Sequence, residues 1–386
     1  MSVVIVHPSL NRGGGAEKVC LTTIRALMHS GYRVKLVTVE RTDWPFLEKS
    51  FGVLYRPSEE AYIMEGMPIR GKFSQRIFSP AFFLSELCYQ MVKDEGAVVV
   101  NTYGDLVDSV ADVSYINALP VRVMYHYPRY GFSNSIVWRS FAQAYGLCLR
   151  VVDKLFRSNI LLANSTFTQG IVRRHLGRES LVVFPPVDVK KFRSNVKDVD
   201  RENIVVAVSR LRVGKNLVFI PRIAKFVKKG EFMILGLADE ASQDAVVALR
   251  KAIKGLGVEN RVRLLINQPF HKLVDVLASA KVFLHTQPME AFGIAVVEAM
   301  AAGCVPVVPR DGGPWFDILD QKQGVFGFSY GSIGEVAQLI ETLFGDEGLR
   351  RAVSARGRER AMVFDSSVFE RGILSVVEKA YSSKFG

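Results

Sequence analysis

The sequence is poor in cysteine, and its four cysteines, Cys20, Cys88, Cys148 and Cys304, lie far apart. Since no Cys-x-x-Cys pair or Cys/His spacing is present, the pattern predicts reduced, buried thiols rather than a zinc site or a disulfide framework. The chain also lacks an apolar run long enough to cross a bilayer. Its first residues, MSVVIVHP, have neither the basic region nor the length of a signal peptide. We therefore expect a protein that is soluble or peripheral to a membrane.

Acidic residues are outnumbered, with 38 Asp and Glu against 50 Lys and Arg, which gives a formal net charge of +12. Such an excess predicts an anionic partner, either nucleic acid, a membrane surface or a phosphorylated small molecule, unless the surface is merely basic. The basic residues are spread over both halves without a nucleic-acid-binding motif, so we expect no nucleic acid partner. The acidic pair at 198–200 lies in a polar segment, and we expect no metal and no cofactor.

The chain alternates strand-like and helical segments. It begins with a strand at 3–8, a glycine turn at 11–17, an amphipathic helix and a strand at 33–40, which is the order of a βαβ unit. After a polar segment at 193–203 the alternation starts again at 204–211. The other predicted strands are 97–103, 121–128, 160–165, 181–187, 231–237, 261–267, 282–288 and 305–310.

This order predicts an α/β fold of two Rossmann-like, doubly wound domains that face each other across a crevice. Ligands bind such domains at the carboxyl ends of their parallel strands. We expect an N-terminal, acceptor-binding domain over 1–195 and a donor-binding domain over 196–365. A final helix over 366–386 is expected to pack back on the N-terminal domain.

The most informative segment is EAFGIAVVEAMAAG, from Glu290 to Gly303. It predicts a helix that starts near Gly293, ends before Gly303 and is apolar on every side, hence buried. An ionised Glu298 inside such a helix is costly unless it is paired. It can pair with an internal Arg or Lys, with Glu290 merely favouring the helix N-terminus. Alternatively, the first helical turn binds a diphosphate, and the two acids accept hydrogen bonds from the ribose and the hexose of a sugar nucleotide.

Two loops and a histidine offer further candidates. Arg210 and Lys215, in AVSRLRVGKN, follow a strand and can converge on one anion, although a solvated surface pair fits equally well. In RGGGAEK, Gly14 and Gly15 permit a close backbone approach to an anionic group, or a simple flexible turn. His126, in YHYP, is either a hydrogen-bonded core residue or a ligand contact.

His7 and His285 lie at the ends of predicted strands and are lesser candidates.

Together these segments resemble the retaining family-four glycosyltransferases of GT-B architecture. The run from Glu290 to Glu298 matches the E-x7-E signature of that family, and Ser209-Arg210 with Lys215-Asn216 matches its diphosphate loop. The chain is more closely similar to α-mannosyltransferases that extend dolichyl-diphosphate-linked oligosaccharides, in HPSLNRGGGAEKV, MYHYPRY, LLANSTFT, VVFPPVDV and DGGPWFDIL. We expect no N-terminal transmembrane helix of the kind found in some eukaryotic members, which leaves the acceptor open.

The resemblance implies a metal-independent hexosyltransferase that uses front-face displacement, with mannose from GDP-mannose as the first expectation and a polyprenyl-linked or other glycan as acceptor. The implied catalytic residues are Arg210, Lys215, Glu290 and His126. The implied donor-binding residues are Gly14, Gly15, Ser209, Arg210, Lys215, Glu290, Ala291, Phe292, Gly293, Ile294 and Glu298. The alternatives are a transferase that uses UDP-glucose on a non-lipid acceptor, an epimerase or phosphorylase of the same architecture, and a silent sugar-nucleotide-binding scaffold.

Residues 72–87 and 131–158 interleave aromatic and basic side chains. This composition is typical of an interfacial helix on an anionic bilayer, and also of an amphipathic helix that packs on a sheet. We expect a cytoplasmic protein, attached peripherally to the cytoplasmic face of a membrane.

Overall fold

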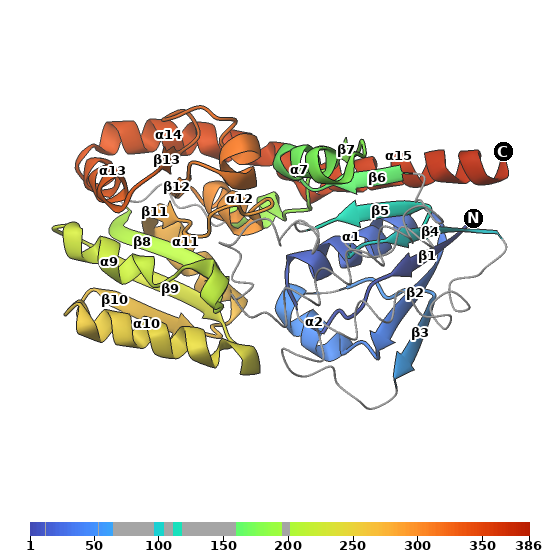
Figure 1. The fold of residues 1–386 in the computed structure, drawn as a ribbon, viewed down its shortest axis with the longest axis horizontal. Coiled ribbons are helices and arrows are strands. Elements are labelled where there is room, and N and C mark those ends of the chain that lie inside the picture. Colours follow the sequence, from blue (N-terminus) through green and yellow to red (C-terminus); the bar gives the residue numbers. More distant parts are fainter. Residues whose placement is uncertain (12, 53, 65–95, 104–110, 118–159, 195–200) are drawn as a thin grey trace. The chain divides into compact units, whose positions relative to one another are not determined.

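The computed structural model describes the chain except for residues 12, 53, 65–95, 104–110, 118–159 and 195–200. The chain divides into two units (Figure 1): Met1–Pro186 with Ser366–Gly386, and Val187–Asp365. The sequence pattern placed the first boundary at 195/196, whereas the second unit already begins at Val187. The reason is that Val187 pairs in parallel with Asp365, at the other end of the same unit.

The first unit is built on a parallel sheet with the order β3-β2-β1-β4-β5-β6-β7. Its strands are β1 (Ser2–Val6), β2 (Arg33–Glu40), β3 (Glu59–Met64), β4 (Ala97–Asn101), β5 (Val113–Ile116), β6 (Ile160–Ala163) and β7 (Leu181–Val182). Within the residues that the structure describes, its helices are α1 (Gly15–His29), α2 (Trp44–Phe51), α7 (Thr166–Leu176) and α15 (Ser366–Phe385). The predicted strand at 121–128 lies outside the described residues.

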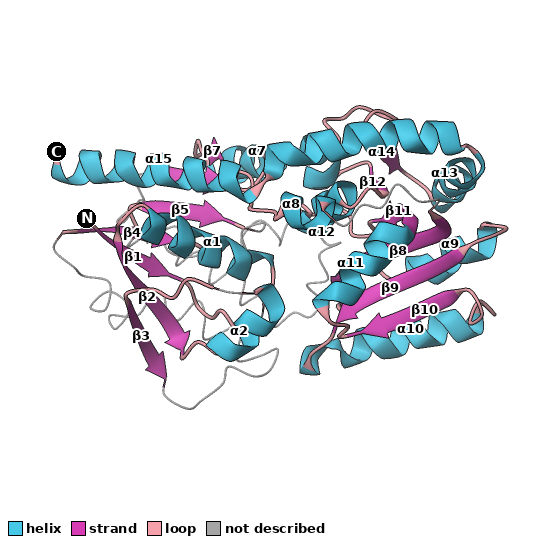
Figure 2. Cartoon of the chain, turned by 180° about the vertical axis from the view of Figure 1, so that it is seen from behind, coloured by secondary structure: helices cyan, strands magenta, loops and turns pink. Residues whose placement is uncertain are grey.

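The C-terminal helix α15 belongs to the core of the first unit, where it packs against α1 (Figure 2). Phe369 and Ile373 are buried among the apolar residues of β1, β4 and α1. The end of the helix is held by Lys384, whose Nζ lies 2.8 Å from Oδ2 of Asp112 and donates to the carbonyl of Ala97 at 2.9 Å. Apolar packing along the helix and an ion pair at its end therefore join this segment to residues far away in sequence.

The second unit has a parallel sheet with the order β10-β9-β8-β11-β12-β13. Its strands are β8 (Glu202–Arg210), β9 (Glu231–Leu237), β10 (Val262–Ile266), β11 (Ala280–Leu284), β12 (Val305–Pro309) and β13 (Phe328–Tyr330). Its α-helices are α8 (Val189–Arg193), α9 (Phe219–Phe226), α10 (Gln243–Gly255), α11 (Phe270–Ser279), α12 (Ile294–Ala301), α13 (Ile333–Gly345) and α14 (Glu347–Ala361). The order reverses between β8 and β11, and ligands bind doubly wound sheets at such a reversal.

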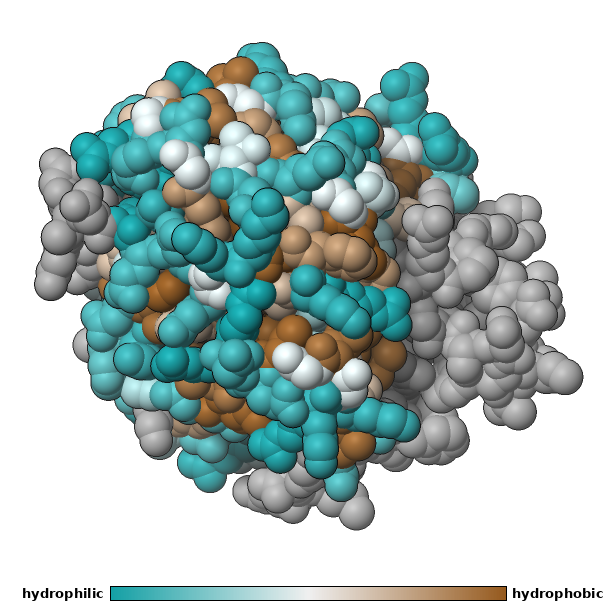
Figure 3. Space-filling view, turned by 90° about the vertical axis from the view of Figure 1, so that its left-hand side faces the viewer, coloured by the Kyte–Doolittle hydropathy of each residue, from teal (hydrophilic) through white to brown (hydrophobic). Residues whose placement is uncertain are grey.

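One face of the molecule, on the side of the second unit, shows hydrophobic side chains in scattered patches among hydrophilic ones (Figure 3). The exposed apolar residues of this unit include Phe226 on α9 and Val247 on α10. In the part of the chain that the structure describes, no helix combines the length and the hydropathy needed to cross a membrane.

Candidate functional site

Most of the predicted donor-binding residues lie at the carboxyl ends of the central strands of the second unit. Ser209 and Arg210 end β8, and Lys215 ends a short 3-10 helix, Val213–Lys215, just beyond it. Glu290 lies in the loop that leads from β11 to α12. These residues share one edge of one sheet, at the point where the strand order reverses.

Lys215 and Glu290 form an ion pair at this edge. Nζ of Lys215 lies 2.7 Å from Oε2 of Glu290, and the two side chains are 25% and 17% exposed. The backbone of Lys215 is fixed as well, because the hydroxyl of Thr286 donates to its carbonyl at 2.8 Å. Partial burial removes much of the screening by water, so this ammonium and this carboxylate interact more strongly than a surface pair.

The neighbouring cation Arg212 is engaged elsewhere. Its guanidinium donates to the carboxylate of Asp239, at a nitrogen to oxygen distance of 2.5 Å, and to the hydroxyl of Ser242. The hydrogen bond from Arg212 lowers the pKa of Asp239 against the opposing effect of burial. Arg212 therefore holds the loop after β9, whereas Arg210 and Lys215 lie near Glu290.

The charge of Glu290 is set by the cations around it. Burial by itself raises the pKa of this carboxyl, but Lys215, His285 and Arg210 lower it, and the net pKa lies below the ordinary value. Glu290 is consequently ionised at neutral pH and can accept hydrogen bonds, but it has no proton to give.

His285 follows β11 directly and completes this cluster. Its Nε2 lies 3.7 Å from Oε2 of Glu290, and only 10% of its side chain is exposed. Burial lowers the pKa of His285 to about 4. Glu290 raises this pKa, and Lys215 lowers it further. The imidazole is therefore neutral near pH 7. It lies beside the ion pair of Lys215 and Glu290, in which the two charges balance each other.

This buried histidine predicts a pH dependence of stability. Its pKa is 6.5 when unperturbed and about 4 in the folded chain, so between these values the unfolded chain binds a proton that the folded chain does not. The free energy of unfolding therefore falls as the pH decreases from 6.5 to 4. We expect the wild type to lose on the order of 1 kcal/mol more than His285→Gln between pH 7 and pH 5. Urea unfolding of both proteins at the two pH values measures this difference. Equal losses of unfolding free energy in the two proteins would show that folding does not lower the pKa of His285.

The loop that carries Glu290 is clamped from β12. The N–H of Met289, a residue in the left-handed conformation with φ 52°, donates to Oδ1 of Asp311 at 2.8 Å. The N–H of Gly313 donates to the carbonyl of Glu290 at 2.8 Å. A Cβ at Gly313 would lie 2.3 Å from the carbonyl oxygen of Ala291, so only glycine permits this approach. A non-glycine residue held in the left-handed conformation is strained, and such strain is common at functional sites.

We expect Gly313→Ala to destabilise the second unit by about 1–3 kcal/mol, as overpacking does, and to displace Glu290. Gly334→Ala is the matched control, since a Cβ there meets no atom within 4 Å and the residue lies in α13. Thermal unfolding with a parallel assay of donor binding distinguishes the two variants. Equal melting temperatures for them would contradict the clamp.

Helix α12 corrects the expectation of a helix that is buried on every side. Its residues Val296, Val297 and Ala299–Ala301 are buried, but Ile294, Ala295 and Glu298 are only partly buried. Positions i, i+1 and i+4 share one face of a helix, so Glu298 lies on a half-exposed strip with the first helical residue. The premise that Glu298 is an acid inside an apolar core is therefore wrong.

The ends of α12 follow from two glycines. Gly293 is the N-cap, with φ 100°, and Gly303 follows the C-cap with φ 91°, so the predicted end at Gly303 is confirmed. The adjoining Ala291 and Phe292 are buried, and the ring of Phe292 packs edge-on against Phe364. This anchoring fixes the first turn of α12, where the N–H of Val296 donates to the carbonyl of Gly293 at 2.9 Å. The amino end of a helix carries partial positive charge.

The predicted residues of the first unit have a separate environment. Gly14 is the N-cap of α1, and its N–H donates to Oε2 of Glu17 at 2.8 Å. Gly15 begins the helix and is exposed. Because the chain's own carboxylate already occupies the Gly14 amide, the glycine loop is less able to bind an anion than its sequence indicates. His126 lies outside the described residues, as do 72–87 and 131–158.

Sequence reasoning gave His285 little weight and missed the clamp formed by Asp311, Gly312 and Gly313. The signal for the clamp was available, because two adjacent glycines, Gly312 and Gly313, follow the run at 305–310 after a single aspartate. Paired glycines after a strand indicate a close backbone approach. In the stretches of chain that are described, no group of three His, Cys, Asp or Glu side chains is arranged to hold a metal ion. The absence of a bound metal remains a prediction.

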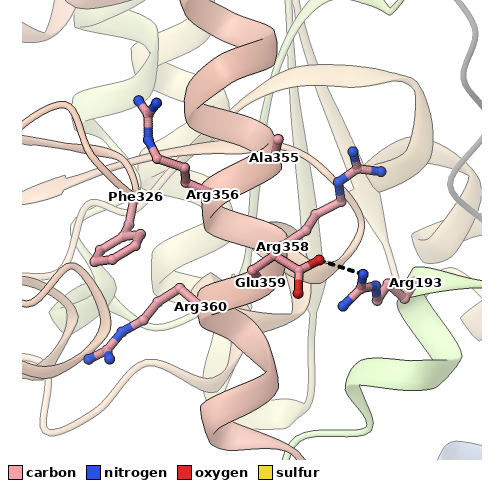
Figure 4. Close-up of a pocket in the computed structure, with 7 residues that line it drawn as sticks. All are labelled: Arg193, Phe326, Ala355, Arg356, Arg358, Glu359 and Arg360. Carbon is pink, nitrogen blue, oxygen red and sulfur yellow. Dashed lines mark hydrogen bonds and ion pairs between the residues drawn. The ribbon is translucent and has the colours of Figure 1, made fainter.

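A pocket on α14 is separate from this site (Figure 4). It is lined by Arg193, Phe326, Ala355, Arg356, Arg358, Glu359 and Arg360. Arg193 pairs with Glu359 at 2.6 Å, and Arg356 and Arg360 donate to carbonyl groups of the segment from Asp317 to Val325. These arginines hold the fold around α14 together, and none of them is a predicted site residue.

The fold and the site define the class of protein. Residues 188–360 match the family model of glycosyl transferases group 1, so the second unit carries a domain of that family. The predicted GT-B fold is confirmed, because the chain aligns over 98% of its length with Anabaena HepE in complex with UDP and glucose (TM-score 0.72, 19% identity, all of that chain covered). Sucrose-phosphate synthase from Thermosynechococcus elongatus aligns over 99% of the chain and all of its own, with a TM-score of 0.75 and 14% identity.

Curated relatives extend over nearly the whole chain. It is 27% identical to a human GDP-Man:Man(3)GlcNAc(2)-PP-Dol alpha-1,2-mannosyltransferase, over 99% of the chain and 87% of the relative. The protein of the same description from Dictyostelium discoideum is 25% identical, over 98% of the chain and 84% of the relative. The prediction that the chain is a glycosyltransferase is therefore confirmed.

Proposed function

We propose that this glycosyltransferase moves mannose from GDP-mannose to a lipid-linked glycan, with retention of the anomeric configuration. The observation that carries the proposal is the contact between Lys215 and Glu290 beside the first turn of α12. In this arrangement a cation and the N–H groups of a helix can bind a diphosphate. The carboxylate beside them can accept hydrogen bonds from sugar hydroxyls. The relatives, which are described as using GDP-mannose on a dolichyl-diphosphate glycan, supply the choice of donor and acceptor.

The chemistry follows from the charges of these groups. Arg210, Lys215 and the N–H groups of the first turn of α12 stabilise the diphosphate as negative charge develops on it, which is the largest contribution expected of a preorganised site. Glu290, ionised because its pKa is lowered, accepts hydrogen bonds from the hexose near the reacting carbon. Glu298, on the half-exposed strip of α12, accepts hydrogen bonds from the ribose.

The transfer is a front-face displacement. The bond between the anomeric carbon and the diphosphate oxygen breaks, and a bond to the acceptor oxygen forms on the same face. The acceptor proton passes to the departing phosphate oxygen, so the products are the nucleoside diphosphate and the new glycoside. Glu290 does not supply this proton, since it has none at neutral pH, and no metal takes part in the proposal.

The test is a transfer assay with the purified chain, GDP-mannose and a dolichyl-diphosphate-linked oligosaccharide, in which the anomeric configuration of the product is read by NMR. The proposal expects an α-linked mannose and release of GDP. A β-linked product would exclude front-face displacement. Transfer from UDP-glucose but not from GDP-mannose would replace the donor, and an epimerised sugar nucleotide as the main product would replace the activity.

We further propose that the protein works at the surface of a membrane, on the cytoplasmic face. The support is its net charge of +12 and the lipid-linked acceptor of the relatives. Sedimentation with vesicles that contain anionic lipid should retain the protein at low salt and release it at high salt, because surface charges are screened. Equal retention by neutral vesicles would contradict an electrostatic attachment.

A further inference from the structure

Both backbone polar groups of His285 form hydrogen bonds, whereas, in the described part of the chain, one nitrogen of its imidazole does not. The N–H of the residue donates to the carbonyl of Val307 at 2.9 Å, and its carbonyl accepts from the hydroxyl of Tyr330 at 2.8 Å. The backbone of His285 is therefore anchored to β12 and β13. Within the described residues, however, its buried Nε2 has no hydrogen-bond partner.

An unpaired, buried ring nitrogen needs an explanation, because leaving a buried polar atom without a hydrogen bond destabilises the folded chain. Oε2 of Glu290 lies 3.7 Å from this nitrogen, which is beyond hydrogen-bonding distance. That oxygen is occupied by Nζ of Lys215 at 2.7 Å. A hydrogen bond between the imidazole and the backbone of Gln287 already favours a proton on the ring. When neutral, a ring that donates this hydrogen bond presents a bare Nε2 to the carboxylate.

We propose that His285 is a positioning residue that replaces Lys215 as the cationic partner of Glu290 when the donor binds. This inference rests on the proposed function, which assigns Lys215 to the donor diphosphate. As Lys215 turns to the diphosphate, the carboxylate of Glu290 loses its counter-charge. His285 then binds a proton at Nε2, and the imidazolium closes the 3.7 Å gap to Oε2. Glu290 is thereby held for the hexose throughout the exchange.

The charges around the ring support this direction. Lys215 opposes protonation of His285, and Glu290 favours it. Arg210 lies near enough to lower the pKa of Glu290, but it is also assigned to the diphosphate. Asp311 and Arg310, on the loop after β12, and Tyr330, on β13, are further titratable groups on the elements that hold His285, and Arg310 is paired with Glu335. Moving the ammonium of Lys215 from Glu290 to the ligand therefore favours protonation of His285.

The exchange has a consequence that a purely structural histidine would not have, since donor binding takes up a proton from solution. Isothermal titration of the full chain with GDP-mannose at pH 6.5, in PIPES and in imidazole buffer, measures this uptake from the difference in heat. The ligand adds no proton of its own, because both of its phosphates stay singly charged near this pH. We expect the wild type to bind a fraction of a proton per donor, at most about one.

In His285→Gln the uptake should vanish while binding remains measurable, and His271→Gln, an exposed histidine on α11, should keep it. Heats of the wild type that do not depend on the buffer would overturn the exchange, as would an uptake that persists in His285→Gln. Failure to bind any sugar nucleotide would instead overturn the proposed function itself, so the two failures are distinguishable. The wild-type measurement decides even if the variant folds poorly.

Discussion

Lys215→Ala is expected to lower the rate of sugar transfer by about 100- to 1,000-fold, the size of effect seen when one preorganised donor is removed from a developing oxyanion. The ammonium stabilises the diphosphate most strongly when it departs, so the loss should appear mainly in kcat rather than in KM. The variant also leaves Glu290 without the ion pair that spans 2.7 Å. Some loss of stability is therefore expected beside the loss of activity.

Lys229→Ala is the matched control for this prediction. Lys229 is exposed and precedes the amino end of β9, at the opposite edge of the same sheet, and its loss removes the same charge from the chain. We expect it to retain full turnover. Steady-state kinetics of both variants, with circular dichroism as a check of folding, make the comparison. Unchanged turnover in a folded Lys215→Ala protein would remove this residue from the site.

Glu298→Ala is expected to raise the dissociation constant of the sugar nucleotide about 10- to 100-fold, the value of hydrogen bonds to a charged group. Alanine is the best helix former and Glu298 is only half-buried, so α12 should keep its structure. Calorimetric titration measures the affinity, and the melting temperature reports the fold. Glu378→Ala, an exposed glutamate on α15, is the control.

The result that contradicts this role is an unfolded Glu298→Ala protein whose folded fraction still binds the donor normally. That outcome would support the alternative that Glu298 pairs with an internal cation.

The sequence predicted those strands whose apolar residues form continuous runs. EFMILGL at 231–237 coincides with β9 (Glu231–Leu237), because a strand covered on both faces reads as one apolar run. It did not predict β3, whose EEAYIM begins with two acids, β5, which has only four residues, or β13, which has only three. β3 and β13 are edge strands, so one side of each has no neighbouring strand and the sequence pattern is weaker. β5 lies inside its sheet, and its run is too short to give a clear pattern.

For the site, local sequence patterns predicted those features that depend on residues of a single segment. The glycines at 293 and 303 fix the ends of α12, and the strand order brings Arg210 and Glu290 to the same edge. The ion pair between Lys215 and Glu290 could not be predicted, because 75 residues separate its partners and no periodicity connects them. The same holds for the burial of His285, which depends on strands that follow it in the chain.

The central claim is that Arg210, Lys215 and the first turn of α12 bind the diphosphate of a sugar nucleotide. Calorimetric titration of GDP-mannose into the wild type and into the double variant Arg210→Ala/Lys215→Ala tests it most directly. We predict saturable binding by the wild type, and binding at least about 100-fold weaker by the double variant, since two charge-assisted contacts are lost. Equal affinity of the two folded proteins would contradict the claim.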